Sequence, residues 1–373
     1  MTETAAGGPL PAISEVGGSN LRDWLGERRQ PGYRADQILG GVDRGPANGF
    51  ADLTVLPLSL RADLTGAFAF SSLTASRVVA TEGGGTAKAV HLLADGQRIE
   101  SVRMTYGPRG APTRTTICIS SQAGCAVACP FCATGQAGFG RQLSAAEIVD
   151  QVLFWRRQAA DPAAPHTNIV FMGMGEPLNN TERVFEAVRI LNDPARLGIG
   201  ARHITVSTSG VVPNMERMVD ELPQVNLAVS LHAADDDLRD ELVPINRKWP
   251  IARVLEAARG FAQRTGRRVS LEYVLIAGVN DNLDQATALG RLATGWLSHV
   301  NLIPLNPTPD SAWAGSSLEQ AHRFADGVRS EGVAVTLRDT RGRSIEAACG
   351  QLHAQLSRRQ LLDVSEPLVL AGS

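Results

Sequence analysis

Three closely spaced cysteines are the clearest chemical signal in the chain. Cys125, Cys129 and Cys132 follow the pattern CxxxCxxC, so one loop can turn all three sulfurs toward a common centre. Thiolates are soft ligands that suit zinc or an iron–sulfur cluster. A closed structural zinc site needs a fourth ligand, and the next histidine, His166, lies beyond a predicted helix. Three thiolates alone indicate a [4Fe–4S] cluster with one open iron; structural zinc and a disulfide pair are the alternatives.

Two more cysteines stand apart from this group. Cys118 lies in a predicted strand seven residues before Cys125, and Cys349 follows the last predicted strand. A free cysteine often packs as a small apolar side chain, and that interpretation stays open for both at this point. The total of five cysteines, three of them in one loop, does not fit the disulfide framework of a small secreted protein.

The composition is that of an ordinary globular protein of 373 residues with a formal net charge of −2. That charge gives no global sign of nucleic-acid binding, so any RNA-binding surface must be local. No apolar run is long enough to span a bilayer, and the first 18 residues lack the basic-then-apolar order of a signal peptide. We therefore expect a cytoplasmic, reducing location, no membrane association and a monomer.

The pattern of residues divides the chain into five segments. Residues 1–18 are small and rich in glycine and proline, which predicts disorder. Residues 19–74 predict a helical accessory domain, and residues 75–110 predict a β-hairpin extension or linker. Residues 111–352 alternate strands with helices and form the expected core, followed by a C-terminal tail at residues 353–373.

Apolar strands separated by amphipathic helices predict a parallel sheet covered by helices, which is an α/β fold. Six or so such units without a GxGxxG turn favour a partial (β/α)6 barrel over a dinucleotide-binding fold. The expected strands cover residues 115–120, 168–172, 203–207, 225–230, 269–276, 300–304 and 333–337. In barrels the chemistry lies at the C-terminal ends of the strands, so we expect the functional residues there.

Polar residues and glycines follow several of these strands. They are Gly175 and Glu176, Ser207, Ser230 with Leu231 and His232, and Asn306. A glycine lets the backbone approach a ligand closely, and a carboxylate can hold an ammonium group or a ribose hydroxyl. One such turn is more often only a turn, but several beside a three-cysteine loop predict one shared binding site.

A series of motifs along the chain carries a family resemblance. In order they are CISSQAGCAVACPFCATGQAGF, MGMGEPL, STSGVVPN, SLHA, LVPIN, NLIPLNP, TRG and AACGQL. They closely resemble the RlmN/Cfr family of radical S-adenosylmethionine (SAM) RNA adenine methyltransferases, over about residues 20–352. The likeness is greatest to the RlmN branch, which methylates carbon 2 of an adenosine in the peptidyl-transferase centre of 23S rRNA. Some members also methylate the adenosine beside the tRNA anticodon, whereas the Cfr branch methylates carbon 8 of the rRNA adenosine.

The resemblance implies a radical-SAM barrel, an accessory RNA-binding domain at the helical N-terminus, and roles for particular residues. The ligands of one [4Fe–4S] cluster would be Cys125, Cys129 and Cys132. The SAM-binding positions would be Gly175, Glu176, Ser207, Ser230, Leu231, His232 and Asn306. Cys349 matches the cysteine that becomes S-methylated, Cys118 its resolving partner, and Glu100 a proton acceptor. A solvent-facing side chain is the usual alternative for a strand glutamate, and residues 106–112 make a longer link to Cys118 than the family pattern has.

By the same resemblance, each turnover uses two SAM molecules and an electron from a flavodoxin- or ferredoxin-type protein. Carbon 2 of adenine is electrophilic, so SAM cannot alkylate it directly. The first SAM methylates the Cys349 thiolate, and the second yields a radical that takes hydrogen from the S-methyl group. The methylene radical then adds to the ring. Loss of the ring proton to Glu100 or Cys118, and attack by Cys118 on the Cys349 sulfur, release methylated RNA and leave a transient disulfide.

Two other functions compete with this hypothesis. A radical-SAM enzyme with another substrate does not account for the pair Cys118 and Cys349. A non-catalytic zinc or iron–sulfur RNA-binding module needs neither the polar strand ends nor the C-terminal cysteine.

Three groups of arginines could contact RNA phosphates, which would supply affinity. They are Arg103, Arg109 and Arg114; Arg264, Arg267 and Arg268; and Arg338, Arg341 and Arg343. We expect the last group to do so because it is adjacent to Cys349; a solvated surface is the alternative for the others.

Overall fold

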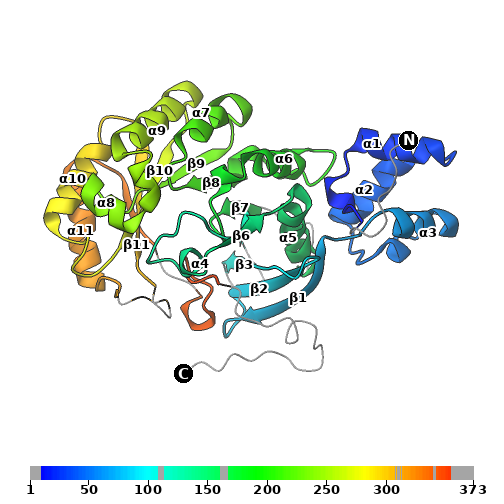
Figure 1. Cartoon of the computed structure of the whole chain (residues 1–373), viewed down its shortest axis with the longest axis horizontal. Helices are drawn as coiled ribbons and strands as arrows, with labels where there is room; N and C mark the ends of the chain where they lie inside the picture. The colour runs from blue at the N-terminus through cyan, green and yellow to red at the C-terminus, as the bar shows by residue number, and fades with distance from the viewer. Residues whose placement is uncertain are drawn as a thin grey trace.

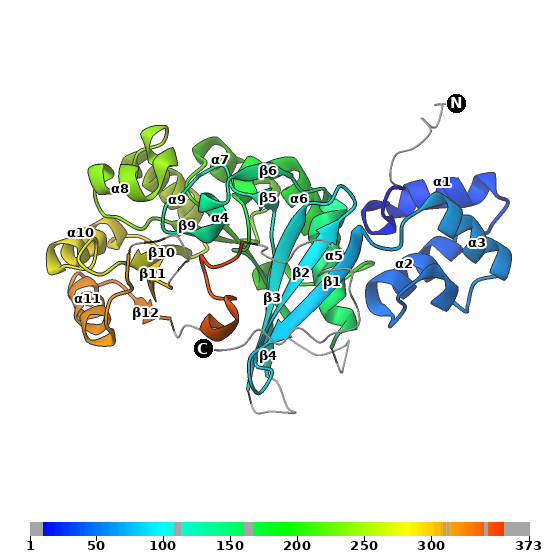
Figure 2. The ribbon, with the colours of Figure 1, turned by 60° about the horizontal axis from the view of Figure 1, so that its bottom comes forward.

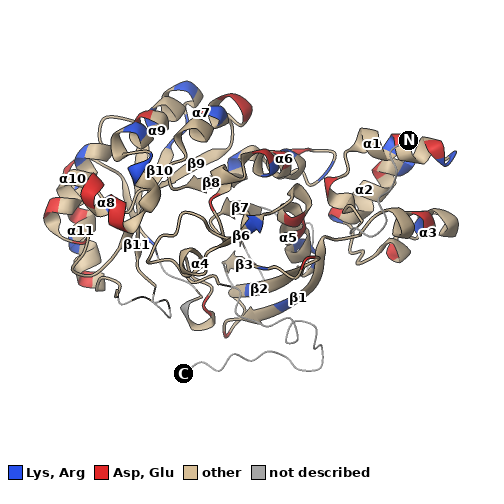
Figure 3. Cartoon of the chain, in the orientation of Figure 1, with Lys and Arg blue, Asp and Glu red and all other residues tan. Residues whose placement is uncertain are grey.

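The computed structural model describes residues 10–107, 113–159, 167–306, 308, 311, 313–338 and 342–353. Figure 1 shows a small helical unit at the N-terminal end, beside a larger body built on one sheet. Figure 3 shows acidic and basic residues interspersed over the outer helices, as the near-neutral net charge suggests. No helix in the described ranges is both long and apolar enough to cross a membrane.

The helical unit has three α-helices and two short 3-10 turns. They are η1 (Ile13–Glu15), α1 (Gly18–Glu27), α2 (Arg34–Arg44), η2 (Phe50–Asp52) and α3 (Leu58–Ala67). The predicted disorder of residues 1–18 is wrong for residues 10–18, because Ile13 and Ser14 are fully buried and the Ile13 N–H donates to Ala69 O. Residues 1–9 lie outside the described part.

A buried ion pair fastens this unit to the larger body. The Arg196 guanidinium binds the Asp43 carboxylate, and Arg196 also donates to Ser14 O at 2.9 Å. In return, Arg44 Nε donates to Arg196 O at 2.7 Å. These contacts join residues between 152 and 182 positions apart, so the helical unit is packed on the core and not only linked to it by the chain.

One ten-stranded sheet runs through the body, in the order β1-β2-β3-β4-β7-β8-β9-β10-β11-β12. Its strands are β1 (Leu73–Ala80), β2 (Thr86–Leu93), β3 (Arg98–Tyr106), β4 (Arg114–Cys118), β7 (Thr167–Phe171), β8 (Ile204–Thr208), β9 (Asn226–Ser230), β10 (Val269–Leu275), β11 (Ser298–Pro304) and β12 (Val335–Leu337). The strands from β4 to β12 pair in parallel, which confirms the α/β class, and β1 and β12 are the edges of an open barrel. The extension β1–β3 is antiparallel and continues the same sheet through β3–β4 pairing, so it is part of the core and not a linker.

Helices connect the parallel strands and cover the sheet (Figures 1 and 2). They are α5 (Ala145–Arg157), α6 (Thr181–Asn192), α7 (Val212–Glu221), α9 (Ile251–Thr265), α10 (Leu283–Ala293) and α11 (Leu318–Ser330). In α6 the buried residues Val184, Val188 and Leu191 recur at helical spacing and form one apolar face. The predicted capping box is confirmed at α5, where Ser144 Oγ accepts from the Glu147 N–H at 3.1 Å and Glu147 Oε2 accepts from the Ser144 N–H at 2.9 Å.

Several short elements have no periodic sequence signal and were not predicted. They are the hairpin of β5 (Gln122–Gly124) and β6 (Phe139–Gln142), the single turn α4 (Ala133–Gln136), and α8 (Asp236–Leu242). The hairpin closes both ends of the three-cysteine loop. Gly124 is required there, because it has φ +78° and an added Cβ would lie 2.0 Å from Gly138 O.

Candidate active site

The loop that carries the three cysteines is held by its own backbone. The Cys125 N–H donates to Gly138 O at 2.8 Å, and the Cys132 N–H donates to Cys129 O at 3.1 Å. Gly135 packs against Cys129 so closely that a Cβ would lie 2.7 Å from Cys129 O. The three thiols consequently line one cavity.

The three thiols fit an iron–sulfur cluster better than a single ion. Burial raises the pKa of Cys125 to about 12 and the pKa of Cys129 well above its ordinary value, and in both the charge of Cys132 acts in the same direction. Thiols this close together need added positive charge to ionise, which iron supplies. Within the described ranges no three His, Cys, Asp or Glu side chains converge on a point suited to one metal ion. In a [4Fe–4S] cluster each thiolate binds a different iron, so the sulfurs need not converge.

Most of the predicted SAM-binding residues line the same cavity. They are Gly175, Glu176, Ser207, Ser230 and His232. Leu231 is fully buried and does not line it, and Asn306 lines a second cavity beside Cys349 instead. The C-terminal ends of β7, β8 and β9 thus meet at one mouth, as the parallel sheet requires.

Two of these turns have constrained geometry. Gly175 has φ +101°, and a Cβ there would lie 2.5 Å from Gln122 Cβ. Glu176 is buried, and its Oε2 accepts from both the N–H and the Oγ of Ser209 at 2.7 Å. Burial raises the pKa of Glu176 above its ordinary value, although the hydrogen bonds from Ser209 act in the opposite direction. The carboxylate therefore ties the ends of β7 and β8 together at the cavity wall.

His232 is held as a neutral ring. Its backbone has φ +64°, its Nδ1 accepts from the Val274 N–H at 3.1 Å, and its ring meets Phe131 edge-on with centroids 5.1 Å apart. Burial, together with the charge of Arg239, lowers the pKa of His232 to about 3. Nδ1 acts as acceptor, so the proton is on Nε2, which can donate a hydrogen bond to a ligand.

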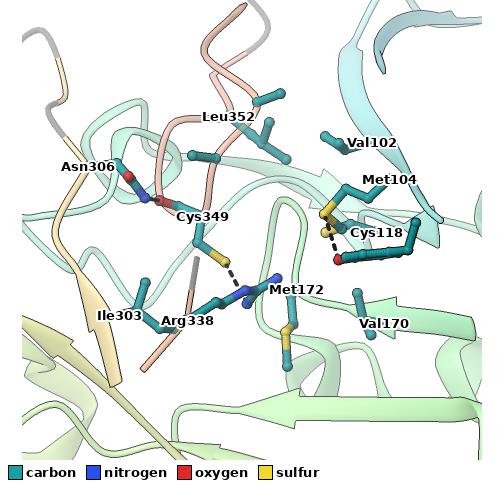
Figure 4. A pocket seen from close by; sticks show the side chains of 13 residues that line it. Val102, Met104, Cys118, Val170, Met172, Ile303, Asn306, Arg338, Cys349 and Leu352 are labelled. Carbon is teal, nitrogen blue, oxygen red and sulfur yellow. Dashed lines mark hydrogen bonds between the residues drawn. The ribbon is translucent and has the colours of Figure 1, made fainter. Parts of the chain in front are cut away.

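A second cavity contains both of the remaining cysteines. Cys118 and Cys349 line it together with Tyr106, Met172 and Arg338 (Figure 4). Cys349 also lines the three-cysteine cavity, so its side chain stands between the two spaces. Both cysteines are free thiols. Their placement argues against packing as their only role.

The backbone around Cys349 is anchored to the cluster loop. Asn306 Nδ2 donates to Cys349 O at 3.0 Å, the Ala133 N–H donates to Gly350 O at 2.7 Å, and Thr134 Oγ1 donates to Leu352 O at 2.5 Å. Figure 1 shows this C-terminal segment beside α4. Asn306 is thus a support for the Cys349 segment.

Arg338 places a positive charge between the two cysteines. Its Nη1 lies 3.8 Å from Cys349 Sγ, and Cys349 is the main cause that raises the pKa of Arg338. Burial raises the pKa of Cys118 to about 12, as does the charge of Cys349, whereas Arg338 lowers it. Arg338 is partly buried and lines this cavity beside Cys349, and its expected contact with RNA stays a prediction. Arg341 and the side chain of Arg343 lie outside the described part of the chain.

Sequence reasoning missed Glu272, which lines the three-cysteine cavity from the middle of β10. Its Oε2 accepts from Asn301 Nδ2 at 2.7 Å, and burial raises its pKa. The available signal was one acid in an otherwise uncharged, buried strand, Val269–Leu275.

Glu100 is buried, which corrects the solvent-facing alternative: only 1% of it is exposed. It does not line either cavity, but it lies two residues before Val102, which does, so both side chains are on one face of β3. Val102 is paired with Cys118 across β3 and β4. Glu100 thus lies on the strand that pairs with the strand of Cys118.

Comparisons with known proteins identify the family of the chain. Residues 119–288 match the Radical SAM superfamily. The chain is 49% identical over 353 residues to the probable dual-specificity RNA methyltransferase RlmN of Thermobifida fusca, covering 93% of this chain and 95% of that one. The corresponding Rhodococcus opacus protein is 46% identical over 369 residues, covering 95% and 98%. The chain belongs to the RlmN family.

A solved structure supports the same assignment. A radical SAM methyltransferase from Sphaerobacter thermophilus is 48% identical and superposes with a TM-score of 0.89, covering 92% of this chain and all of that one. The protein is accordingly a SAM-dependent RNA methyltransferase with a radical-SAM core. Cys118 lies one residue before the segment that matches the superfamily and Cys349 lies beyond its C-terminal end, so the second cavity is built partly from segments outside that match.

Proposed function

We propose that this enzyme methylates carbon 2 of an adenosine in the peptidyl-transferase centre of 23S rRNA, and of an adenosine beside the anticodon of tRNA. The observation that carries the proposal is the position of Cys349 between two cavities, with Cys118 in the second. The dual-specificity name of the relatives supports two RNA substrates. Methylation of carbon 8, as in the Cfr branch, is the alternative for the same adenosine.

Cys125, Cys129 and Cys132 would hold one [4Fe–4S] cluster, and the polar strand ends beside them would hold SAM. When bound, a cluster reduced by a flavodoxin- or ferredoxin-type protein would supply the electron for the cleavage of SAM, and the radical formed from SAM would take hydrogen from the methyl group on Cys349. Cys349 first acquires that methyl group as a thiolate, by displacement at a first SAM. Its place between the cavities lets the methyl group meet SAM on one side and the base on the other.

The target base would enter the second cavity after leaving its stack, as in other base-modifying enzymes. There Cys118 lines the same cavity as Cys349 and would attack its sulfur once the methylene carbon is bonded to the ring. A base must take the ring proton, and Glu100 is proposed for that role because it is a buried acid on the strand face of Val102.

Product analysis tests the proposal. Anaerobically purified protein with its cluster and SAM is examined by mass spectrometry for a methyl group on Cys349, then incubated with 23S rRNA or tRNA. We expect S-methylated Cys349 and 2-methyladenosine in the nuclease digest of both RNAs. The appearance of 8-methyladenosine supports the alternative. An unmodified Cys349 contradicts the mechanism and favours a different radical-SAM reaction.

Replacing Arg338 with glutamine is expected to slow alkylation of Cys349 roughly tenfold or more at neutral pH in the cluster-free protein. The reason is that only a thiolate gains from the guanidinium, and hydrogen bonds to charged groups contribute about 1.5–3 kcal/mol. The rate is measured by mass spectrometry of the Cys349 peptide during treatment with iodoacetamide.

The matched control is Arg329→Gln in α11. Arg329 is paired with Asp326 at 2.7 Å and donates to Val335 O at 3.5 Å, away from both cavities. This variant is expected to react at the wild-type rate. Equal rates for Arg338→Gln and the wild type would show that Arg338 does not favour the reactive form of Cys349.

A further inference from the structure

A buried ion pair lies beside the second cavity; one member, Glu100, is the proposed base, and the other, Lys88, has no part in the chemistry described so far. Lys88 Nζ is 3.3 Å from Glu100 Oε1, and the two side chains are 5% and 1% exposed. Across the sheet Lys88 is paired with Val102, which is paired with Cys118, so the ammonium shares the face of the resolving cysteine. Apolar residues of similar size often stabilise a fold at least as well as a buried ion pair does. The presence of the Lys88–Glu100 pair is therefore weak evidence for a purely structural role.

The two carboxylate oxygens of Glu100 have different surroundings. Oε1 faces Lys88, while Oε2 is buried and has no partner within 3.5 Å in the described part of the chain; the nearest further donor to the carboxylate is the His353 backbone N–H, which lowers its pKa. The backbone is held in place, because Ser120 Oγ donates to Glu100 O at 2.6 Å. Buried carboxylate oxygens normally have partners, so a free one at this position is suited to accept a proton from a ligand.

The same ammonium also holds the segment that carries Cys349. Lys88 Nζ donates to Glu346 O at 3.2 Å, three residues before Cys349. Glu346 has φ +50°, an unfavourable conformation for this residue, and the turn is closed by the Ala347 N–H bonding to Gly342 O at 2.9 Å. One lysine therefore joins the Glu100 carboxylate to the strained turn before Cys349.

We propose that Lys88 is a positioning residue: it keeps Glu100 ionised as the acceptor of the ring proton and holds that carboxylate in register with the Cys349 turn. This rests on the proposed function. Burial raises the pKa of Glu100, and Lys88 and then His353 act in the opposite direction. A neutral Glu100 could not accept a proton. In the step it serves, the ring C–H bond breaks, an O–H bond forms at Glu100, and the bonding electron pair stays in the ring.

The test compares Lys88→Met, Lys88→Arg and Glu100→Gln in cluster-loaded enzyme. Without an ionised base, Cys349 should still be methylated and the RNA adduct should still form, but proton loss should be slow. We expect Lys88→Met to turn over roughly 100-fold more slowly than the wild type and to accumulate RNA covalently bound to Cys349 although Cys118 is present. Glu100→Gln should behave in the same way, and Lys88→Arg should recover much of the rate.

A second measurement, hydrogen exchange of cluster-free protein across residues 342–353, tests the contact between Lys88 Nζ and Glu346 O separately from catalysis. Lys88→Met should increase exchange there because Glu346 O loses its donor, whereas Glu100→Gln keeps that donor and should exchange like the wild type. If the buried lone charge prevents Lys88→Met from folding, the double variant Lys88→Met/Glu100→Gln removes both charges. Its rate should equal that of Glu100→Gln alone, because the two residues act as one unit.

The proposal is overturned if Lys88→Met turns over like the wild type, or if it loses Cys349 methylation and forms no adduct. A double variant much slower than Glu100→Gln also contradicts it. Failure of the proposed function looks different: in that case the wild type itself shows no methyl group on Cys349 and no methylated RNA.

Discussion

Replacing Cys118 with alanine is expected to leave RNA covalently attached to the protein through Cys349. Cys118 and Cys349 line one cavity, and no other cysteine lines it, so no other thiol in the described ranges is placed to attack the Cys349 sulfur. Methylation of Cys349 and addition to the base do not need Cys118, but release does. The adduct is measured as RNA that stays with denatured protein, and mass spectrometry after nuclease digestion locates it on Cys349.

The control for this result is the double variant Cys118→Ala/Cys349→Ala, which keeps the cluster ligands and should carry no RNA. Cys118 is buried as a small side chain, so alanine should be tolerated with a modest loss of packing. Methylated Cys349 without any adduct, or an adduct at a residue other than Cys349, would contradict the assignment of Cys118 as the resolving cysteine.

Replacing Cys129 with alanine is expected to abolish RNA methylation altogether. The variant should contain little iron and sulfide, should lack the brown colour of thiolate-to-iron absorption, and should not cleave SAM to 5′-deoxyadenosine. The physical reason is that the loop presents three thiols to one cavity, and the remaining two leave two irons without protein ligands. Iron and sulfide content, visible spectra and SAM cleavage are measured on anaerobically reconstituted protein.

Cys118→Ala is the matched control for the Cys129 variant, because it also removes a buried cysteine but one outside the cluster loop. It should keep the colour, the iron content and SAM cleavage. A colourless wild-type protein that binds one zinc ion would contradict the cluster and support the zinc-module alternative.

The sequence was informative where function depends on residues that are close together along the chain or on the regular alternation of strands and helices. Three cysteines in one short loop can be read from their spacing because the loop itself brings them together. The strand ends could also be predicted to converge, because parallel strands place their C-terminal ends at one edge, and five of the seven expected SAM positions do line the cluster cavity. The alternation of strands and helices likewise placed the parallel core before any contact was known.

The sequence could not locate contacts that depend on register between distant segments. Lys88 contacts Glu346 across 258 residues, and Arg338, just after β12, contacts Cys349, and no periodicity in the sequence encodes either contact. The same limit made Glu100 look like an ordinary surface residue, because burial of β3 depends on which segment covers it. Short elements such as β5 and β6 were also missed, since three or four residues carry no periodic signal.

The sequence by itself therefore determined the chemistry of the three-cysteine loop, the α/β core and the family. Only the tertiary structure decided that Cys349 stands between two cavities, that Arg338 lies beside its sulfur, and that Lys88 joins Glu100 to the turn before it. The reason is physical: residue type and spacing control what a segment can bind, whereas the closing of long loops and the pairing of strands control which segments meet.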